Sequence, residues 1–135
     1  MASVPLNKIL DAIETTLNGS SIDFSQVETY EGQLEDIENC LITPPSAFYE
    51  IEMGRSESEN YLIIDTTLNL YLCANHMKGN KPTSMYTILW TLISEFHQAA
   101  IDDYSCFFTG FERLGIFPGF CVYRASFTLK YEPGA

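Results

Sequence analysis

Residues 61–74 read YLIIDTTLNLYLCA, a run in which apolar and polar side chains alternate. The alternating sets are Leu62, Ile64, Leu68, Leu70 and Leu72 on one side, and Asp65, Thr67 and Asn69 on the other. Because side chains in a strand point to opposite faces in turn, this period of two predicts a long, half-buried strand. At about 3.3 Å per residue the run would span about 46 Å, more than the diameter of about 37 Å expected for a compact chain of this length. The strand therefore crosses the whole body, bends, or projects from it.

The segment before this strand predicts a hairpin partner for it. Ala47–Met53 also alternates, and the link Gly54–Asn60 is polar and begins with glycine. Such a link is typical of a hairpin loop, and we expect its tip to be mobile. A two-stranded ribbon is marginally stable in water and usually needs a partner surface. The hairpin therefore favours a role in assembly over a role in catalysis.

The remaining pattern predicts three helices and three more strands. The predicted helices are Val4–Leu17, the acidic Gln33–Leu41 that ends before Pro44-Pro45, and a main core helix that begins after a Thr83 or Ser84 cap and reaches Ala100. The predicted strands are Gln26–Tyr30, Phe107–Arg113 and Cys121–Tyr131, with a turn at Gly115–Gly119 before the last one. Two long helices packed on one face of a mainly antiparallel sheet of four to five strands make a single α+β domain over residues 1–135.

The charge of the chain is concentrated in its first half. The formal net charge is -11, and residues 1–65 hold thirteen acids against Lys8 and Arg55, whereas residues 66–135 hold five acids and five bases. Gripping a nucleic-acid backbone needs clustered Lys and Arg, so this balance argues against such a role. Two interpretations remain open: the acids keep a small protein soluble, or they form a wall that faces a basic partner or repels DNA.

The cysteines and the apolar runs indicate a cytoplasmic chain. Cys40, Cys73, Cys106 and Cys121 lie far apart and form no CxxC pair, so we expect small core residues in a reducing compartment. The amino-terminal residues lack the apolar region of a secretory signal. No run approaches 18 apolar residues, and we therefore expect no membrane span.

Motifs for catalysis and for cofactor binding are missing from the sequence. It contains no GxGxxG, P-loop, GxSxG or HExxH pattern, so we expect no enzyme, no cofactor and no metal. Glu28–Glu38 is interpreted as solvated charge and Asp102-Asp103 as a helix-end turn, in place of an acid-base pair or a calcium loop. A closed pocket with His76 or His97 beside a carboxylate would instead indicate a small ligand-binding or hydrolase domain.

The segment Phe107–Phe120 holds five phenylalanines, more than one short strand and its turn can hide. An exposed apolar patch marks a contact site, and core packing is the equal alternative. A stacking platform for single-stranded nucleic acid would need surrounding bases, and only Arg113 and Arg124 are near.

Several segments together resemble the tail terminator proteins of Mu-like contractile-tailed bacteriophages. They are Glu28–Asp36 with its Tyr-x-Gly turn, Pro45–Glu50 at the start of a strand, the long strand, the core helix and the closing strand Val122–Tyr131. The likeness extends over nearly the whole chain, and the order and spacing of the segments carry it.

This resemblance implies a structural virion protein of the tail and neck, assembled in the host cytoplasm. Such a protein forms a hexameric ring on the head-proximal end of the tail tube and sheath, ends their growth, and joins a neck or head-completion protein. Genomic DNA would pass through an acidic lumen without specific binding. The alternatives are a head-completion or stopper connector of the neck and, from a different class, a small ligand-binding or hydrolase domain.

We expect the interfaces of such a ring in the turn near residue 30, in the hairpin, along the long strand and in the phenylalanine-rich segment. The candidate residues are Tyr30, Glu31, Gly32, Glu35, Asp36, Arg55, Glu57, Glu59, Asp65, Thr67, Asn69, Phe111, Arg113 and Phe117. Of these, Asp65, Thr67 and Asn69 are expected on a strand edge.

Overall fold

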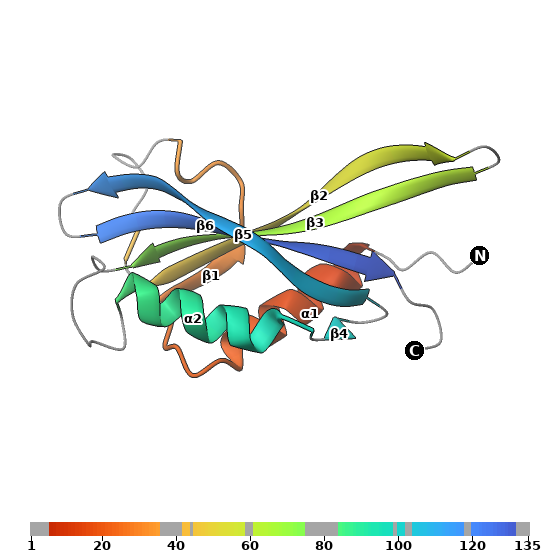
Figure 1. Ribbon diagram of the computed structural model, residues 1–135. Helices are drawn as coiled ribbons and strands as arrows, with labels where there is room; N and C mark the ends of the chain where they lie inside the picture. Colours follow the sequence, from red (N-terminus) through yellow and green to blue (C-terminus); the bar gives the residue numbers. More distant parts are fainter. Residues whose placement is uncertain are drawn as a thin grey trace.

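The structure, a computed structural model, describes residues 6–35, 42–43, 45–58, 61–74, 84–98, 100–101, 104–117 and 120–131. Its elements are α1 (Leu6–Asn18), β1 (Gln26–Thr29), β2 (Ser46–Ser58), β3 (Tyr61–Ala74), α2 (Met85–Phe96), β4 (Ala100–Ile101), β5 (Tyr104–Phe117) and β6 (Phe120–Tyr131). The strands form one sheet in the order β1-β2-β3-β6-β5-β4, and only the β1–β2 pair is parallel (Figure 1). The predicted α+β class with a mainly antiparallel sheet is confirmed.

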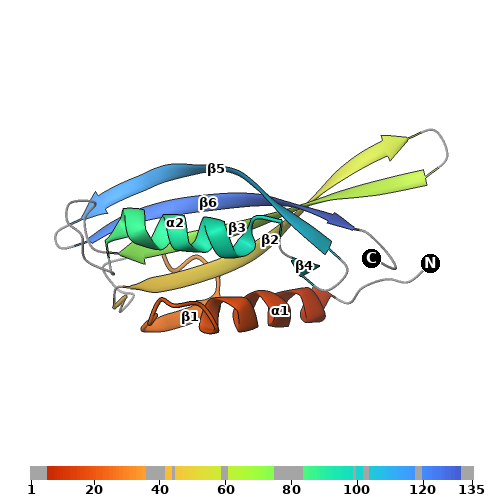
Figure 2. The same cartoon turned by 60° about the horizontal axis from the view of Figure 1, so that its bottom comes forward.

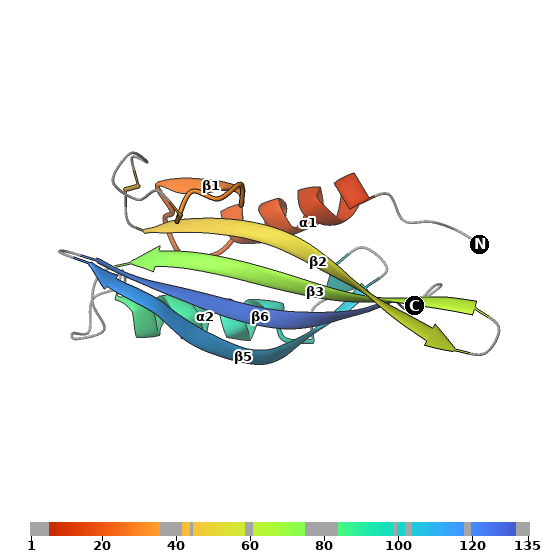
Figure 3. The ribbon, with the colours of Figure 1, turned by 90° about the horizontal axis from the view of Figure 1, so that it is seen from above.

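Strand β3 has the bounds that its alternation predicts, and it lies in the interior of the sheet. It pairs with β2 along its whole length, from Ser46↔Cys73 to Ser58↔Tyr61, but with β6 only over Thr66–Ala74. Residues 54–58 and 61–65, here called the arm, therefore pair only with each other among the described residues. Figures 1 and 3 show the arm extending beyond the rest of the sheet.

Two predicted loops are strand instead. The link Gly54–Asn60 was expected to be a loop, yet β2 continues to Ser58. The turn expected at Gly115–Gly119 is also wrong in part, because β5 pairs with β6 as far as Phe117↔Phe120. In both places the ladder of cross-strand hydrogen bonds outweighs a local composition that disfavours strands. Register shifts between Phe108/Gly110 and Arg113/Gly115 mark irregularities in β5.

Both helices pack on the same face of the sheet (Figure 2). Helix α1 buries Ile9, Ile13 and Leu17, which recur at helical spacing, and it ends at the Asn18-Gly19 stop. Helix α2 begins after Ser84, whose side chain lies 3.0 Å from the Thr87 hydroxyl and does not cap the helix. The buried residues of this core include Leu68, Leu70, Leu72, Tyr123, Ala125, Phe127 and Leu129 from the sheet, and Ile88, Leu89, Leu92 and Phe96 from α2.

The carboxyl end of α2 differs from the prediction. The helix ends at Phe96, and Ala100 belongs to β4. His97 is already extended, with ψ 124°, and Gln98 after it takes a left-handed conformation with φ 64°. The N–H of Gln98 donates to the carbonyl of Cys106 at 2.6 Å. The last turn of α2 is thereby tied to β5.

Part of the predicted acidic helix and the Thr83 cap lie outside the described residues. Gln33–Glu35, the described part of that helix, forms a turn in which the N–H of Glu35 donates to the carbonyl of Gly32 at 3.0 Å. Neither of the two described helices is long and apolar enough to cross a bilayer.

Candidate interface surfaces

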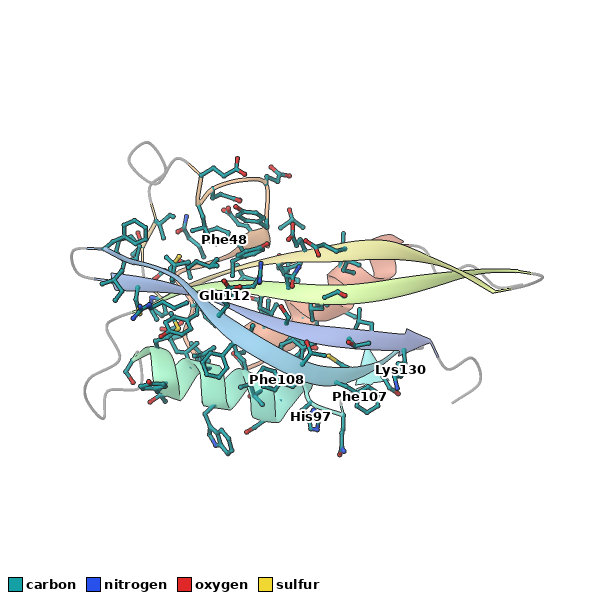
Figure 4. The ribbon with its side chains drawn as sticks, turned by 45° about the horizontal axis from the view of Figure 1, so that its top comes forward. Phe48, His97, Phe107, Phe108, Glu112 and Lys130 are labelled. Carbon is teal, nitrogen blue, oxygen red and sulfur yellow. The ribbon has the colours of Figure 1, made fainter. Side chains whose placement is uncertain are left out.

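The face of the sheet opposite the helices carries a second apolar cluster. Its buried members are Phe48, Tyr71, Cys73 and Val122, and Tyr30, Leu34, Ile42, Phe117 and Phe120 pack against them. The rings of Tyr30 and Tyr71 stack with centroids 4.1 Å apart. The turn after β1 therefore lies over this outer face and shields one end of it from water, near the Phe48 label in Figure 4.

The turn at residues 30–35 is fixed by hydrogen bonds between nearby residues and by one hydrogen bond to β2. Tyr30 N–H donates to the carbonyl of Tyr49 at 2.7 Å. The Gln33 amide donates to the carbonyl of Thr29 at 3.0 Å and accepts the N–H of Glu31 at 2.6 Å. Gly32 has φ +89°, a conformation that favours glycine because it has no Cβ. The Tyr-x-Gly-Gln sequence thus builds a defined turn.

This turn and the end of β5 together form a small depression, here called the outer hollow. Its volume is about 200 Å³, and it is lined by Tyr30, Leu34, Glu35, Leu114, Phe117 and Val122. Three of the predicted interface residues, Tyr30, Glu35 and Phe117, meet here although they come from distant parts of the chain. The apolar lining with one exposed carboxylate suits an aliphatic or aromatic side chain of a partner better than a reaction.

A polar row crosses the middle of the outer face. Tyr71 donates its hydroxyl to Glu50 Oε1 at 2.5 Å, and the Asn69 amide approaches the same oxygen at 3.4 Å. Ser126 Oγ donates to Asn69 Oδ1 at 2.8 Å. Burial, and next the hydrogen bond to Glu50, raise the pKa of the Tyr71 phenol far above its ordinary value. The row is a satisfied network that links β2, β3 and β6.

The expected edge position of Thr67 and Asn69 is wrong. Both lie in the part of β3 that has β2 on one side and β6 on the other, and Asn69 is only 3% exposed. The period of two correctly separates the two faces of the strand, but it does not indicate which strands flank it. Asp65 lies on the arm, where β3 pairs with β2 alone among the described strands.

An exposed ion pair and an exposed histidine occupy other parts of β5 and its neighbours. Arg124 Nη2 lies 2.6 Å from Glu112 Oε2 on the outer face. His97, at the end of α2, accepts the N–H of Phe108 at Nδ1 over 3.1 Å, and its ring meets Phe107 edge-on (Figure 4). Lys130 Nζ lies 5.3 Å from the centre of the Phe107 ring. His97 therefore serves a structural contact between α2 and β5.

The described residues contain no group of His, Cys, Asp and Glu that could hold a metal ion. His76 and Cys40 lie outside them. Cys73, Cys106 and Cys121 are buried, as expected of core residues, and burial raises the pKa of each thiol. Thiols kept protonated in this way are poor nucleophiles.

Exposed large apolar residues gather on α2 and β5. In the described part of the chain they are Tyr86, Trp90, Phe111, Leu114 and Ile116, with Trp90 72% and Tyr86 58% exposed. Phe111 confirms that some of the phenylalanine-rich segment reaches the surface. Tyr86 and Trp90 were missed, although both fall outside the buried helical stripe of Ile88 and Leu92, and that displacement could have identified them.

The other predicted interface residues fall in two places. Arg55, Glu57 and Asp65 lie on the arm, at register positions Arg55↔Ile64, Glu57↔Leu62 and Gly54↔Asp65. Phe111 and Arg113 lie on β5, paired with Ala125 and Tyr123.

Two candidates, Asp36 and Glu59, lie outside the described residues.

A scan of the chain against protein-family models finds no match, and a search of curated proteins finds none. Function is therefore argued from the arm, the outer hollow, and the exposed apolar residues of α2 and β5.

Proposed function

We propose that this chain is a structural ring subunit, the tail terminator that caps the head-proximal end of a contractile tail tube and sheath. In this role it ends tail growth and offers the surface to which the neck joins. The observation that carries the proposal is the arm. Its two strands, each about 17 Å long, pair only with each other among the described strands.

The arm supports assembly because no described strand pairs with the backbone groups along its outer edges. Isolated two-stranded ribbons are marginally stable, and exposed strand edges attract other chains. A neighbouring subunit or the end of a tube would cover these groups and stabilise the ribbon. A free-standing enzyme has no evident need for such an extension.

The charge of the chain supports a passage for DNA. Six copies, each with a net charge of -11, would carry six times that charge, or -66. Acids on a lumen wall repel phosphates and keep DNA from adhering. The order of segments that resembles tail terminators gives the proposal its specific form.

The first test is the solution mass of the wild-type chain over a concentration series, by light scattering coupled to size exclusion. We expect a species near six times the chain mass of 15.3 kDa, either alone or after addition of purified tail tubes. A chain that stays monomeric at high concentration, both alone and with tubes, contradicts the proposal. Binding to a portal or adaptor ring in place of the tube would support the neck connector.

A shortened variant tests the arm itself. Residues 54–65 are replaced by Asn-Gly, which joins the paired residues Met53 and Thr66 through a tight hairpin turn. The variant should keep the circular dichroism spectrum and nearly the melting temperature of the wild type, because the arm contacts no other described strand. It should lose the ring. A shortened chain that still forms rings contradicts the role of the arm.

A further inference from the structure

Four of the exposed apolar side chains and one exposed base lie on α2 and β5, two elements that contact each other. We define the aromatic face as Tyr86 and Trp90 of α2, Phe111 and Ile116 of β5, and Arg113 between the last two. The single ion pair among the described residues is Glu112–Arg124, so Arg113 has no acidic partner there. The aromatic face is thus apolar, with one positive charge that no described acid pairs with.

Contacts indicate that this face is continuous across α2 and β5. The rings of Phe111 and Tyr123 lie 5.9 Å apart, and Arg113 pairs with Tyr123 across the strands. Burial chiefly raises the pKa of the Tyr123 phenol; the nearby Tyr86 raises it further, and Arg113 opposes the rise. Helix α2 contacts β5, so Tyr86 of α2 and Arg113 of β5 belong to elements that lie side by side.

Trp90 belongs to the same side of α2. It follows Tyr86 by four residues, a spacing that brings two side chains to one helical stripe. Helix α2 contacts β5, and His97, directly after the helix, accepts a hydrogen bond from β5 at Phe108. The stripe that carries Trp90 therefore runs beside β5.

The opposite edge of the sheet has the opposite character. It is formed by β1, with α1 lying against it, and we define the acidic edge as its exposed acids Asp11, Asp23, Glu28 and Glu31. Residues 9–54 contain ten acids and no Lys, Arg or His. Lys8 of α1 is a base on the same helix as Asp11, and the acids of the segment far outnumber it. The acidic edge therefore keeps a net negative charge, which Arg113 of another copy could neutralise.

We propose that the aromatic face of one copy packs against the acidic edge of a second copy of this chain. Because the two surfaces differ and lie toward opposite edges of one sheet, successive copies join head to tail, the arrangement that closes into rings. Trp90, Tyr86 and Phe111 supply the apolar contact, and Arg113 supplies the charge that selects the acidic edge. This inference rests on the proposed ring and names the contact that builds it.

The fluorescence of Trp90 tests the aromatic face directly, since it is the single tryptophan of the chain. In wild-type protein, emission should move to shorter wavelength and acrylamide quenching should fall several-fold as the ring forms. Both are recorded on the same samples as the solution mass. A ring whose Trp90 stays as quenchable as in the monomer overturns the inference and leaves the ring intact. Shielding that begins only when tail tubes are added to a preformed ring assigns the face to the tube and also overturns it.

Charge reversal tests the acidic edge. Arg113→Glu should shift the ring to monomer, whereas Lys130→Glu, an exposed base on the other face of the same strand pair, should leave it unchanged. Adding Asp11→Lys and Glu28→Lys to the Arg113→Glu chain should restore the ring and the shielding of Trp90. If this triple variant has a wild-type circular dichroism spectrum but regains neither the ring nor the shielding of Trp90, or only one of them, the proposed contact between the aromatic face and the acidic edge is overturned. Absence of any ring in the wild type refutes the proposed function instead.

Discussion

Both faces of the sheet hold buried side chains, but by different means. On the helix side, α1 and α2 cover aliphatic and aromatic side chains, and Leu70 and Phe127 are fully buried. On the outer side, a short turn covers one end and a polar network crosses the middle, and Tyr71 is only 8% exposed. Every buried side-chain nitrogen and oxygen of the described residues has a hydrogen-bond partner. A face without helices can therefore be buried where its polar groups satisfy one another.

The largest effect is expected on the helix side. Phe127 packs against Phe96 and Phe108, with ring centroids 5.5 Å away in both cases. Phe127→Ala should lower the free energy of unfolding by about 3–5 kcal/mol, because it removes a large apolar side chain and leaves a cavity. Urea denaturation measures the change. Thr128→Ala, on the outer face of the same strand, is the control and should cost far less; equal costs would contradict the difference between the faces.

Removing one hydroxyl from the outer face should lower the free energy of unfolding. Tyr71→Phe removes the hydrogen bond to Glu50 and leaves a partly buried carboxylate short of a donor. The free energy of unfolding should fall by about 1–3 kcal/mol. The matched control is Tyr49→Phe on the helix side, because no hydrogen bond of the Tyr49 hydroxyl is found among the described residues, and its effect should be within about 0.5 kcal/mol. Indistinguishable results for the two variants would show that the network adds no stability.

The loss of stability at alkaline pH compares the burial of one thiol from each face of the sheet. Burial raises the pKa of Cys73, in the outer cluster, and of Cys106, in the helix-side core, to about 12. Above about pH 8.5 these thiols ionise in the unfolded chain but keep their protons in the folded one, so stability falls as pH rises towards 12.

Each thiol should contribute a slope of up to about 1.4 kcal/mol per pH unit in that window. Urea denaturation at pH 8 to 11 measures the total slope, and Cys73→Ala and Cys106→Ala should each reduce it. If only Cys106→Ala does so, the outer face is wetter than the structure indicates.

The smallest effect is expected for the exposed ion pair at the rim of the outer face. Glu112 is 62% exposed, so Glu112→Gln should cost about 0.2–1 kcal/mol, and the loss should disappear in high salt. Thermal unfolding with and without salt measures it. A larger cost that persists in salt would mean that this pair contributes to the core of the outer face.

Local patterns predicted most of the fold, and they failed where pairing outweighed composition. The alternation of β3 and the helical spacing of α1 correctly located those elements. The polar residues after Met53 and the glycine at Gly115 suggested loops, but a partner strand in register keeps both segments extended. The end of α2 was placed too late, because Ala100 is a good helix former that nevertheless pairs with β5.

The candidate surfaces were predicted only in part, for a related reason. Tyr30, Glu35 and Phe117 were each chosen from local composition, and their meeting in the outer hollow depends on how the turn crosses the sheet. Trp90 is exposed, whereas most of the other apolar residues of α2 are buried. The apolar sequence around it therefore predicted a buried side chain. Asn69 appeared to be an edge residue because alternation carries no information about neighbouring strands.

The sequence by itself determined which side chains share a face, because the direction of each side chain follows from the period of its own helix or strand. It also determined the concentration of acids in the first half and the absence of known catalytic motifs. Only the tertiary structure decided that β3 is interior and that the arm pairs with nothing else described. It also decided that Asn69 is buried and that α2 packs against β5. These features arise from contacts between residues far apart in the chain, whose formation depends on the packing of the whole sheet rather than on any local preference.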